Sequence, residues 1–287
     1  MYGSACSLPA APPSLQGTLK APDWRRPRAA ELEDAQDHYS NDMEDLKISL
    51  IIPAFNEGKY IGRTLDSVNK AKDHYKNPSL IEIIVVDNNS TDNTEQIAKK
   101  KGATVVKEEK RCIASVRNRG AQVSRGSVLG FLDADSSVSP NIFNSIDDVM
   151  SSGKYIGGGM TIKLDRKSLG IFLTRCLTTI PAKWLFGVAG GLIFTGRQTF
   201  ESLGGFDESL YCAEDTKFIL GMKKHGKTKG QKFKVITTNY VISSSRSFDQ
   251  FSDWYYFKNL PKIALRGGIK AFRDKDFCWR FWYNVRR

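Results

Sequence analysis

Short apolar runs alternate with stretches of mixed polar and apolar residues along the first half of the chain. The apolar runs predict strands at 48–52, 81–86, 103–106 and 127–132. The stretches between them predict helices at 57–72, 92–101 and 112–125. Asp92 and Glu95 have the spacing of a capping pair at the start of the second helix. Strands that alternate with helices favour an α/β fold, in which helices cover both faces of a mostly parallel, Rossmann-like sheet.

The pattern is less regular in the second half. It predicts strands at 155–164, 190–195 and 234–242, a short helix at 197–203, and a helix that begins at Glu214. An irregular or amphipathic segment spans 165–188, and an aromatic-rich helical pattern spans 248–265. Residues 1–45 are rich in alanine, proline, serine and charged residues without periodicity, so we expect a disordered N-terminal extension there.

Composition bears on where the protein works. No basic region followed by an apolar core is visible near the N-terminus, so no secretory signal is expected. The longest apolar stretch, 169–194, is interrupted by Arg175 and Lys183 and falls short of a membrane-spanning helix. The five cysteines are scattered and form no Cys-x-x-Cys pair, which indicates reduced thiols. We therefore expect a cytoplasmic protein, and peripheral attachment to the inner face of a membrane stays open.

The net charge of +12 is concentrated in the C-terminal part of the chain. From residue 216 onward there are 17 Lys and Arg against 4 Asp and Glu. The tail, 247–287, also interleaves aromatic with basic residues, a mixture that suits an anionic membrane surface. Two simpler interpretations explain the same pattern. The aromatic rings could cover the sheet or mediate dimerisation, and the basic residues could form a solvated face. A nucleic-acid partner is not favoured.

Polar clusters follow three of the predicted strands. They are Pro53–Glu57, Asp87–Ser90 and Asp133–Asp135. Ligands of parallel α/β sheets bind at the carboxyl ends of the strands, so the three clusters are expected to meet at one binding site. The Asp133/Asp135 pair suits Mg²⁺ or Mn²⁺, which prefer oxygen ligands and often share them with substrate phosphates.

These clusters belong to a longer series of motifs that resembles a known family. The chain is similar to family 2 glycosyltransferases of the GT-A fold over roughly residues 46–246. The similarity rests on residues 51–57, 85–92, 116–120, 131–135, 194–197, 204–208 and 214–215. The resemblance implies a nucleotide-binding half at about 46–136 and an acceptor half at about 137–246. It also implies inverting transfer of a hexose from a nucleotide-sugar, with UDP as the first guess, to a hydroxyl on a lipid-linked or polysaccharide acceptor.

The resemblance assigns roles to individual residues. It implies that Asp215 is the catalytic base and that Glu214 orients the acceptor. It places Asp135 and Asp133 on a Mn²⁺ or Mg²⁺ ion, although no histidine after His225 is present to complete the shell. The residues it places on the nucleotide-sugar are Pro53, Ala54, Glu57, Asp87, Asp133 and Arg246. Arg111, Arg117 and Arg246 are candidate phosphate contacts, because a guanidinium fork matches diphosphate oxygens.

Simpler interpretations exist for several of these residues. Asp87 could cap a strand end, and Glu57 and the Glu214–Asp215 pair could be acidic residues favoured at helix starts. Arg111 and Arg117 could be surface or helix-packing residues. A nucleotidyltransferase or a dinucleotide-dependent oxidoreductase would need a glycine-rich loop after the first strand, where this chain has Pro-Ala-Phe-Asn-Glu. A non-catalytic protein that binds nucleotide-sugar, membrane or nucleic acid is the alternative function.

Overall fold

The computed structural model describes residues 46–166, 168–170, 172–173, 191–210 and 213–246. The predicted extension at 1–45, most of the segment at 165–188 and the tail at 247–287 lie outside these residues. The expected helix at 248–265 and the expected attachment of the tail to a membrane therefore stay predictions.

The first half of the chain alternates strands and helices, as its apolar pattern predicts. The elements are β1 (Ile48–Ala54), α1 (Ile61–Asp73), the 3-10 turn η2 (Pro78–Leu80), β2 (Ile81–Asp87), α2 (Thr94–Lys100), β3 (Thr104–Lys107), α3 (Ile113–Val123) and β4 (Val128–Leu132). Helix α1 begins later than predicted, because residues 57–60 form a turn. In that turn the Glu57 carbonyl accepts the backbone N–H groups of Tyr60 and Ile61, both at 2.8 Å.

The second half contains two elements that the sequence pattern did not indicate, β5 and α4. The elements are β5 (Ser136–Val138), α4 (Ile142–Ser151), β6 (Tyr155–Leu164), β7 (Leu192–Gly196), α7 (Arg197–Ser202), α8 (Glu214–Thr228) and β8 (Lys232–Ser243). Strand β5 is too short for a detectable pattern. It exists because it pairs with β8, more than a hundred residues later in the sequence.

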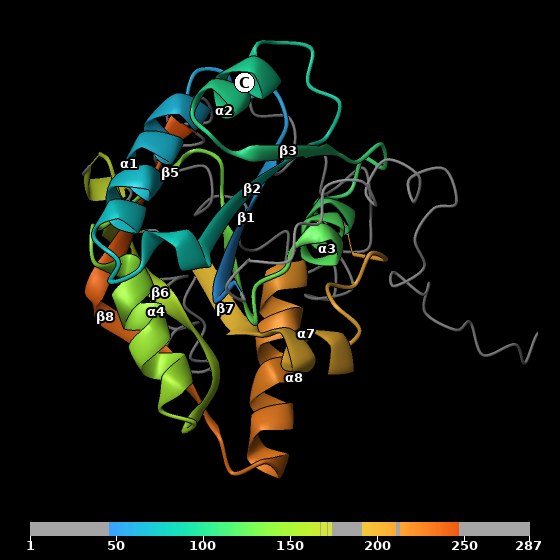
Figure 1. The fold of residues 1–287 in the computed structure, drawn as a ribbon, viewed down its shortest axis with the longest axis vertical. Coiled ribbons are helices and arrows are strands. Elements are labelled where there is room, and N and C mark those ends of the chain that lie inside the picture. The colour runs from blue at the N-terminus through green and yellow to red at the C-terminus, as the bar shows by residue number, and fades with distance from the viewer. Residues whose placement is uncertain (1–45, 167, 171, 174–190, 211–212, 247–287) are drawn as a thin grey trace, which may run out of the picture.

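The strands form one sheet in the order β3-β2-β1-β4-β7-β6-β8-β5 (Figure 1). Strands β3, β2, β1 and β4 are parallel, whereas β7 is antiparallel to both of its neighbours. Strand β8 is parallel to β6, and β5 is antiparallel to β8. The sheet is therefore mostly parallel, and the expected boundary at about residue 136 falls between β4 and β5 within this one sheet.

The two faces of the sheet carry separate apolar cores. Leu50 and Ile52 face one core with residues of α1 and α4, whereas Ile51 faces the other with residues of α3, α7 and α8. Figure 1 shows these two groups of helices on opposite sides of the sheet. The alternation of side chains along a strand explains why β1, which is buried on both faces, reads as a continuous apolar run.

The capping pair predicted at the start of α2 is wrong, because the N-cap residue is Asn93, which makes no side-chain capping hydrogen bond. Asp92 Oδ1 accepts the backbone N–H of Thr94 at 3.0 Å, and its Oδ2 accepts that of Gly58 at 2.9 Å. Glu95, however, does not return the bond, because it pairs with Lys99 and Lys107. Asp92 therefore ties the loop after β1 to the start of α2.

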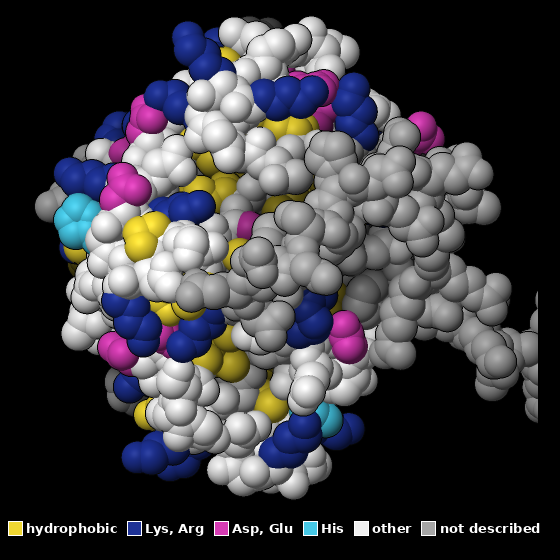
Figure 2. Space-filling view, viewed as in Figure 1, with side chains coloured by type: hydrophobic (Ala, Val, Ile, Leu, Met, Phe, Trp, Pro, Cys, Tyr) yellow, Lys and Arg dark blue, Asp and Glu magenta, His cyan; other side chains and the backbone are white. Residues whose placement is uncertain are grey.

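The surface shows no concentration of one charge on the face in view. Over the described part of the face in Figure 2, Lys and Arg side chains lie in several separate groups, some of them beside Asp or Glu. None of the helices within the described ranges is long and apolar enough to cross a membrane.

A buried carboxylate on α4 fastens the ends of several elements together. Asp147 is 3% exposed and pairs with Lys47 at 2.5 Å and with Lys76 at 2.7 Å. It also accepts hydrogen bonds from Tyr75 at 2.9 Å and from Ser151 at 2.7 Å. Burial by itself would raise the pKa of Asp147, but these donors hold it well below its usual range.

We expect Asp147→Asn to lower the free energy of unfolding by about 2 kcal/mol at pH 7, the scale of hydrogen bonds to a charged group. Because the folded-state pKa of Asp147 is depressed, its contribution is present above the unfolded pKa of about 4 and disappears as the pH falls through the folded value. Urea unfolding between pH 3 and 7 measures this, and the difference from wild type should shrink in acid. Asp148→Asn, at an exposed position on the same helix, should show no such pH-dependent difference.

Candidate active site

The polar clusters lie at the carboxyl edge of the parallel strands. The last residue of β1, Ala54, pairs in register with the last residue of β2, Asp87, and Asp87 pairs with Lys107 at the end of β3. Asp133 follows the last residue of β4, the other neighbour of β1. The topology therefore places the sequence-predicted Pro53, Ala54, Asp87 and Asp133 along one rim.

The loops after β1 and β2 hold each other in place. The backbone N–H of Asn56 donates to Ser90 Oγ at 2.9 Å, and the N–H of Thr91 donates to Asn56 Oδ1 at 2.8 Å. The N–H of Glu57 donates to Thr94 Oγ1 at 2.8 Å. Asn56 has φ 52°, a left-handed conformation that asparagine adopts more readily than most residues. The loops after β1 and β2 are therefore fixed to each other at this rim by their own hydrogen bonds.

Asp87 carries a buried oxygen that has no partner. The residue is 2% exposed, and its Oδ2 accepts the backbone N–H of Ser90 at 3.3 Å. Its Oδ1 is buried and has no hydrogen-bond partner among the residues that the structure describes. An unsatisfied buried acceptor costs about 1–3 kcal/mol. A strand-end cap alone does not account for this oxygen, whereas an N–H or O–H donor of a ligand would satisfy it.

Arg246, just after β8, joins two of the predicted site carboxylates. Its guanidinium makes a two-pronged contact with Glu57, at 2.6 and 2.8 Å, and its Nη2 lies 3.2 Å from Asp135 Oδ2. It also lies 5.0 Å from the ring centre of Tyr60. Glu57 is 4% exposed, and both of its carboxylate oxygens accept from Arg246 in this structure.

Asp133 and Asp135 offer oxygen ligands of the kind that Mg²⁺ and Mn²⁺ prefer. Their side chains are 47% and 13% exposed, respectively. Burial raises the pKa of Asp135 to about 6, with Arg246 opposing the shift. The carboxylates of Asp133 and Glu57 raise this pKa further, so negative charge is concentrated here.

Within the described ranges, no three His, Cys, Asp or Glu side chains converge to hold a metal ion. Mg²⁺ is usually bound by one or two carboxylates together with substrate phosphates. The Asp133/Asp135 pair therefore fits a divalent cation whose remaining ligands come from a bound diphosphate.

Arg117 is not a surface residue, one of its two simpler interpretations, although it does link helix α3 to the start of α8. It is 7% exposed on α3, where its Nη1 donates to Glu214 and its Nη2 donates to Asp133 Oδ1 at 3.0 Å. Its Nε is buried without a partner. Arg117 thus joins the acidic pair after β4 to the first residue of α8.

Glu214 and Asp215 begin α8 in different environments. Burial raises the pKa of Glu214 to about 7, against the opposing charge of Arg117. Asp215 is partly exposed, and its Oδ1 accepts the backbone N–H of Thr216 at 2.6 Å. Among the described residues, Oδ2 of Asp215 has no hydrogen-bond partner. The preceding Ala213 has φ 59°, an uncommon conformation for alanine that is often found at functional sites.

Six of the predicted site residues therefore form two groups held by ion pairs. One joins Asp133, Arg117 and Glu214, and the other joins Asp135, Arg246 and Glu57. Arg111 belongs to neither group. It stacks 3.5 Å from the ring centre of Phe55 and donates to the Asn88 carbonyl at 3.4 Å.

The sequence interpretation missed several residues that make contacts beside this site. They are Tyr60, Lys110, Asn118 and Glu208. Asn118 and Glu208 lie within the family motifs at 116–120 and 204–208. Their place in these motifs is the only sign of a role that the sequence offers. Tyr60 and Lys110 stand in no motif, and only the folded chain brings them to their partners.

Comparisons with known proteins agree with this arrangement. A sequence model described as glycosyl transferase family 2 matches residues 49–197. An uncharacterised protein of Methanocaldococcus jannaschii, MJ1222, is 29% identical over 237 residues, which cover 74% of this chain and 91% of that protein. The glycosyltransferase AglE of Haloferax volcanii is 34% identical over 96 residues, which cover 31% of each chain. The match to AglE thus spans less than one third of that protein.

Solved structures share the fold at low identity. TarS of S. aureus, residues 1–349 in complex with UDP-GlcNAc, superposes with a TM-score of 0.54 and 19% identity, over 84% of this chain and 74% of that one. The mannosyltransferase PcManGT of Pyrobaculum calidifontis, in complex with GDP-Man and Mn²⁺, superposes with a TM-score of 0.57 and 16% identity, over 76% of this chain and 65% of that one. These similarities confirm the predicted GT-A fold.

Proposed function

The chain belongs to glycosyl transferase family 2, and on this basis we propose that it is an inverting hexosyltransferase. The reaction moves a sugar from a nucleotide-sugar, with a UDP-sugar as the first expected donor, to a hydroxyl of a lipid-linked or polysaccharide acceptor. A tail that attaches to an anionic membrane surface would bring the enzyme to an acceptor of that kind.

One observation carries the proposal. Arg117, itself buried, contacts both the half-exposed donor-side carboxylate of Asp133 and the buried first residue of α8, Glu214. The candidate base Asp215 is the next residue of α8, so this contact supports a base close to the pair expected to hold the donor diphosphate.

In the proposed step the acceptor oxygen attacks the anomeric carbon of the donor sugar. The bond between that carbon and the diphosphate oxygen breaks, and the nucleoside diphosphate leaves with the bonding electrons. Asp215 takes the proton of the acceptor hydroxyl on the carboxylate oxygen that has no partner among the described residues. Because attack and departure occur on opposite faces of the anomeric carbon, its configuration inverts.

The other residues bind and orient the donor. Asp87 Oδ1, the buried oxygen without a partner, accepts a hydrogen bond from the base or ribose. Asp133 contacts the ribose, and with Asp135 it would hold Mn²⁺ or Mg²⁺, which would supply positive charge to the leaving diphosphate. The planar fork of Arg246 matches diphosphate oxygens, and Arg246 would bind them on releasing Glu57, which its Nη1 and Nη2 hold in this structure. The TarS and PcManGT complexes support a nucleotide-sugar donor, and the latter contains Mn²⁺.

A thermal-shift screen tests the donor site. We expect a nucleoside diphosphate at about 100 times its Kd to raise the free energy of unfolding by about 2.7 kcal/mol in the presence of Mn²⁺. Asp135→Ala should remove the Mn²⁺-dependent part of this stabilisation, because it deletes the carboxylate proposed to hold the cation. UDP, GDP and ADP are compared, each with Mn²⁺, with Mg²⁺ and with EDTA.

Asp66→Ala is the matched control, because Asp66 is an exposed carboxylate paired with Lys101 on another part of the surface. It should keep the full Mn²⁺-dependent shift. Each variant is compared with its own nucleotide-free midpoint. An undiminished Mn²⁺-dependent shift in Asp135→Ala would show that the cation is held elsewhere, and a wild-type chain stabilised by none of the three nucleotides would contradict the proposed donor site.

A further inference from the structure

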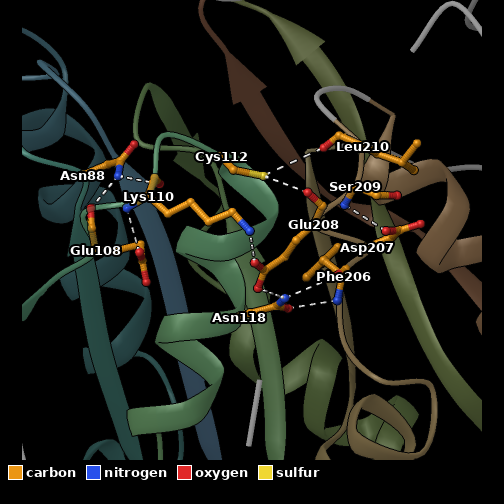
Figure 3. Close-up of polar contacts among 10 residues, drawn as sticks. All are labelled: Asn88, Glu108, Lys110, Cys112, Asn118, Phe206, Asp207, Glu208, Ser209 and Leu210. Carbon is orange, nitrogen blue, oxygen red and sulfur yellow. Dashed lines mark hydrogen bonds and ion pairs between the residues drawn. The ribbon is translucent and has the colours of Figure 1, made fainter. Parts of the chain in front are cut away.

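The loop at 206–210 lies against the loop at 108–112, and Figure 3 shows the contacts that join them. The first loop precedes α8 and the proposed base, and the second follows β3 beside the proposed nucleoside site. Asn88, the residue after Asp87, donates its side-chain N–H groups to the carbonyls of Glu108 and Lys110. The 108–112 loop is thereby held next to Asp87, the proposed contact for the nucleoside.

Glu208 is the centre of the contact between the two loops. Its side chain is only 16% exposed, and it receives the ammonium of Lys110 on one oxygen. Its other oxygen accepts the side-chain N–H of Asn118, on α3, at 3.0 Å. Although burial lowers the pKa of Lys110, the carboxylate of Glu208 raises it above its usual value. The charge pair is therefore favourable in the folded chain.

Two further contacts hold the backbone of the 206–210 loop. The side-chain amide of Asn118, 3% exposed, both accepts the N–H of Phe206 and donates to its carbonyl, each at 2.9 Å. The thiol of Cys112 points to the carbonyls of Glu208 and Leu210, at 3.8 and 3.9 Å. Cys112 is 3% exposed, and burial raises the pKa of its thiol. These contacts leave the loop little freedom.

The same loop is packed onto α8. The rings of Phe206 and Phe218 lie 4.6 Å apart between centres, and Phe206 also meets Phe131 of β4 at 4.9 Å. Lys217, in the first turns of α8, pairs with Asp207. A displacement of the 206–210 loop would therefore move the start of α8, where Glu214 and Asp215 lie.

We propose that Glu208 is a positioning residue: by clamping the 206–210 loop to Lys110 and Asn118, it sets the position of Asp215 relative to the bound donor. The clamp acts on the chemical step and leaves donor affinity unchanged. This inference rests on the proposed function, since it concerns the placement of the proposed base.

The experiment measures turnover, nucleotide affinity and loop opening on the full-length chain. Turnover is nucleoside diphosphate release from UDP-GlcNAc or GDP-mannose, whichever the wild type hydrolyses faster, and affinity is the Kd of the matching nucleoside diphosphate with Mn²⁺. For Glu208→Ala we expect kcat to fall about tenfold to a hundredfold, because the loop loses its contacts with Lys110 and Asn118 and a small misplacement of a catalytic group costs up to about a hundredfold in rate. The Kd should stay within about twofold, because no donor contact is removed.

Alkylation of Cys112 by iodoacetamide, followed at its own peptide by mass spectrometry, reports on the loop directly. Since the thiol is buried under the loop, its reaction requires local opening. Glu208→Ala should accelerate the reaction at least about tenfold, which corresponds to a decrease of about 1.4 kcal/mol in the free energy of local opening. Glu208→Gln, which can still accept from Asn118, should lie between Ala and wild type in both kcat and alkylation rate.

Glu109→Gln is the matched control, because it removes an exposed carboxylate from the same loop region without touching the 206–210 loop. It should match wild type in every readout. An unchanged kcat in Glu208→Ala, or a Kd that rises by as much as kcat falls, would overturn the positioning role. A wild-type chain that hydrolyses neither donor would instead overturn the proposed function and with it any catalytic role of Glu208, while the alkylation rate would still show whether the clamp exists.

Discussion

Asp215→Asn is expected to lower kcat about a thousandfold, within the range that general base catalysis contributes. Asparagine keeps the size of the side chain and can still accept the N–H of Thr216 through its amide oxygen. It cannot take the proton of the attacking hydroxyl. The Kd for UDP with Mn²⁺ should stay within about twofold, since the donor contacts proposed for Asp87, Asp133 and Asp135 are intact. Product release from the nucleotide-sugar measures kcat, and calorimetry measures the Kd.

The control for this variant is Asp66→Asn, which removes an exposed carboxylate outside the site and should leave kcat unchanged. Full turnover in Asp215→Asn would rule out this residue as the base. A parallel loss of nucleotide affinity would instead place Asp215 among the donor contacts.

Arg117→Met is expected to lower the free energy of unfolding by about 4 kcal/mol, because removing one partner of a buried ion pair costs about 3–5 kcal/mol. Arg117 and Glu214 have side chains only 9% and 6% exposed, so the remaining carboxylate would be buried without its cation. Methionine preserves much of the aliphatic volume, which isolates the effect of the charge. Urea unfolding at pH 7 measures the change.

The double variant Arg117→Met with Glu214→Gln should be more stable than Arg117→Met alone, because it also removes the buried charge left without a partner. Arg119→Met is the matched control on the same helix. Arg119 is less deeply buried than Arg117, and its loss should cost no more than about 1 kcal/mol. Equal stability of wild type and Arg117→Met would mean that the pair does not hold α8 to the donor side.

Several parts of the fold were predictable because they depend on local pattern. Strands β1, β2 and β4 are buried on both faces, so each appears in the sequence as a continuous apolar run. Strand β6 alone was predicted with both boundaries as observed, 155–164. The meeting of three polar clusters at one rim also followed from local pattern, because parallel strands end at a common edge.

Other parts depend on contacts between distant segments. Strand β5 forms only against β8, and helix α1 starts late because the loop after β1 is tied to the loop after β2. The reciprocal cap expected from Glu95 failed because two lysines, one of them on β3, compete for its carboxylate. Spacing along the chain does not show which partner is nearer in the folded protein.

The sequence by itself determined the family, the strand and helix order of the nucleotide side, and which acidic residues gather at the rim. Only the tertiary structure decided how the basic residues are used. Arg117 pairs with Glu214 at a separation of 97 residues, Lys110 with Glu208 at 98, and Arg246 with Glu57 at 189. The physical reason is that hydrophobic periodicity is a local property of the chain, whereas the partner of a buried charge is whichever opposite charge the packed elements bring within a few ångströms.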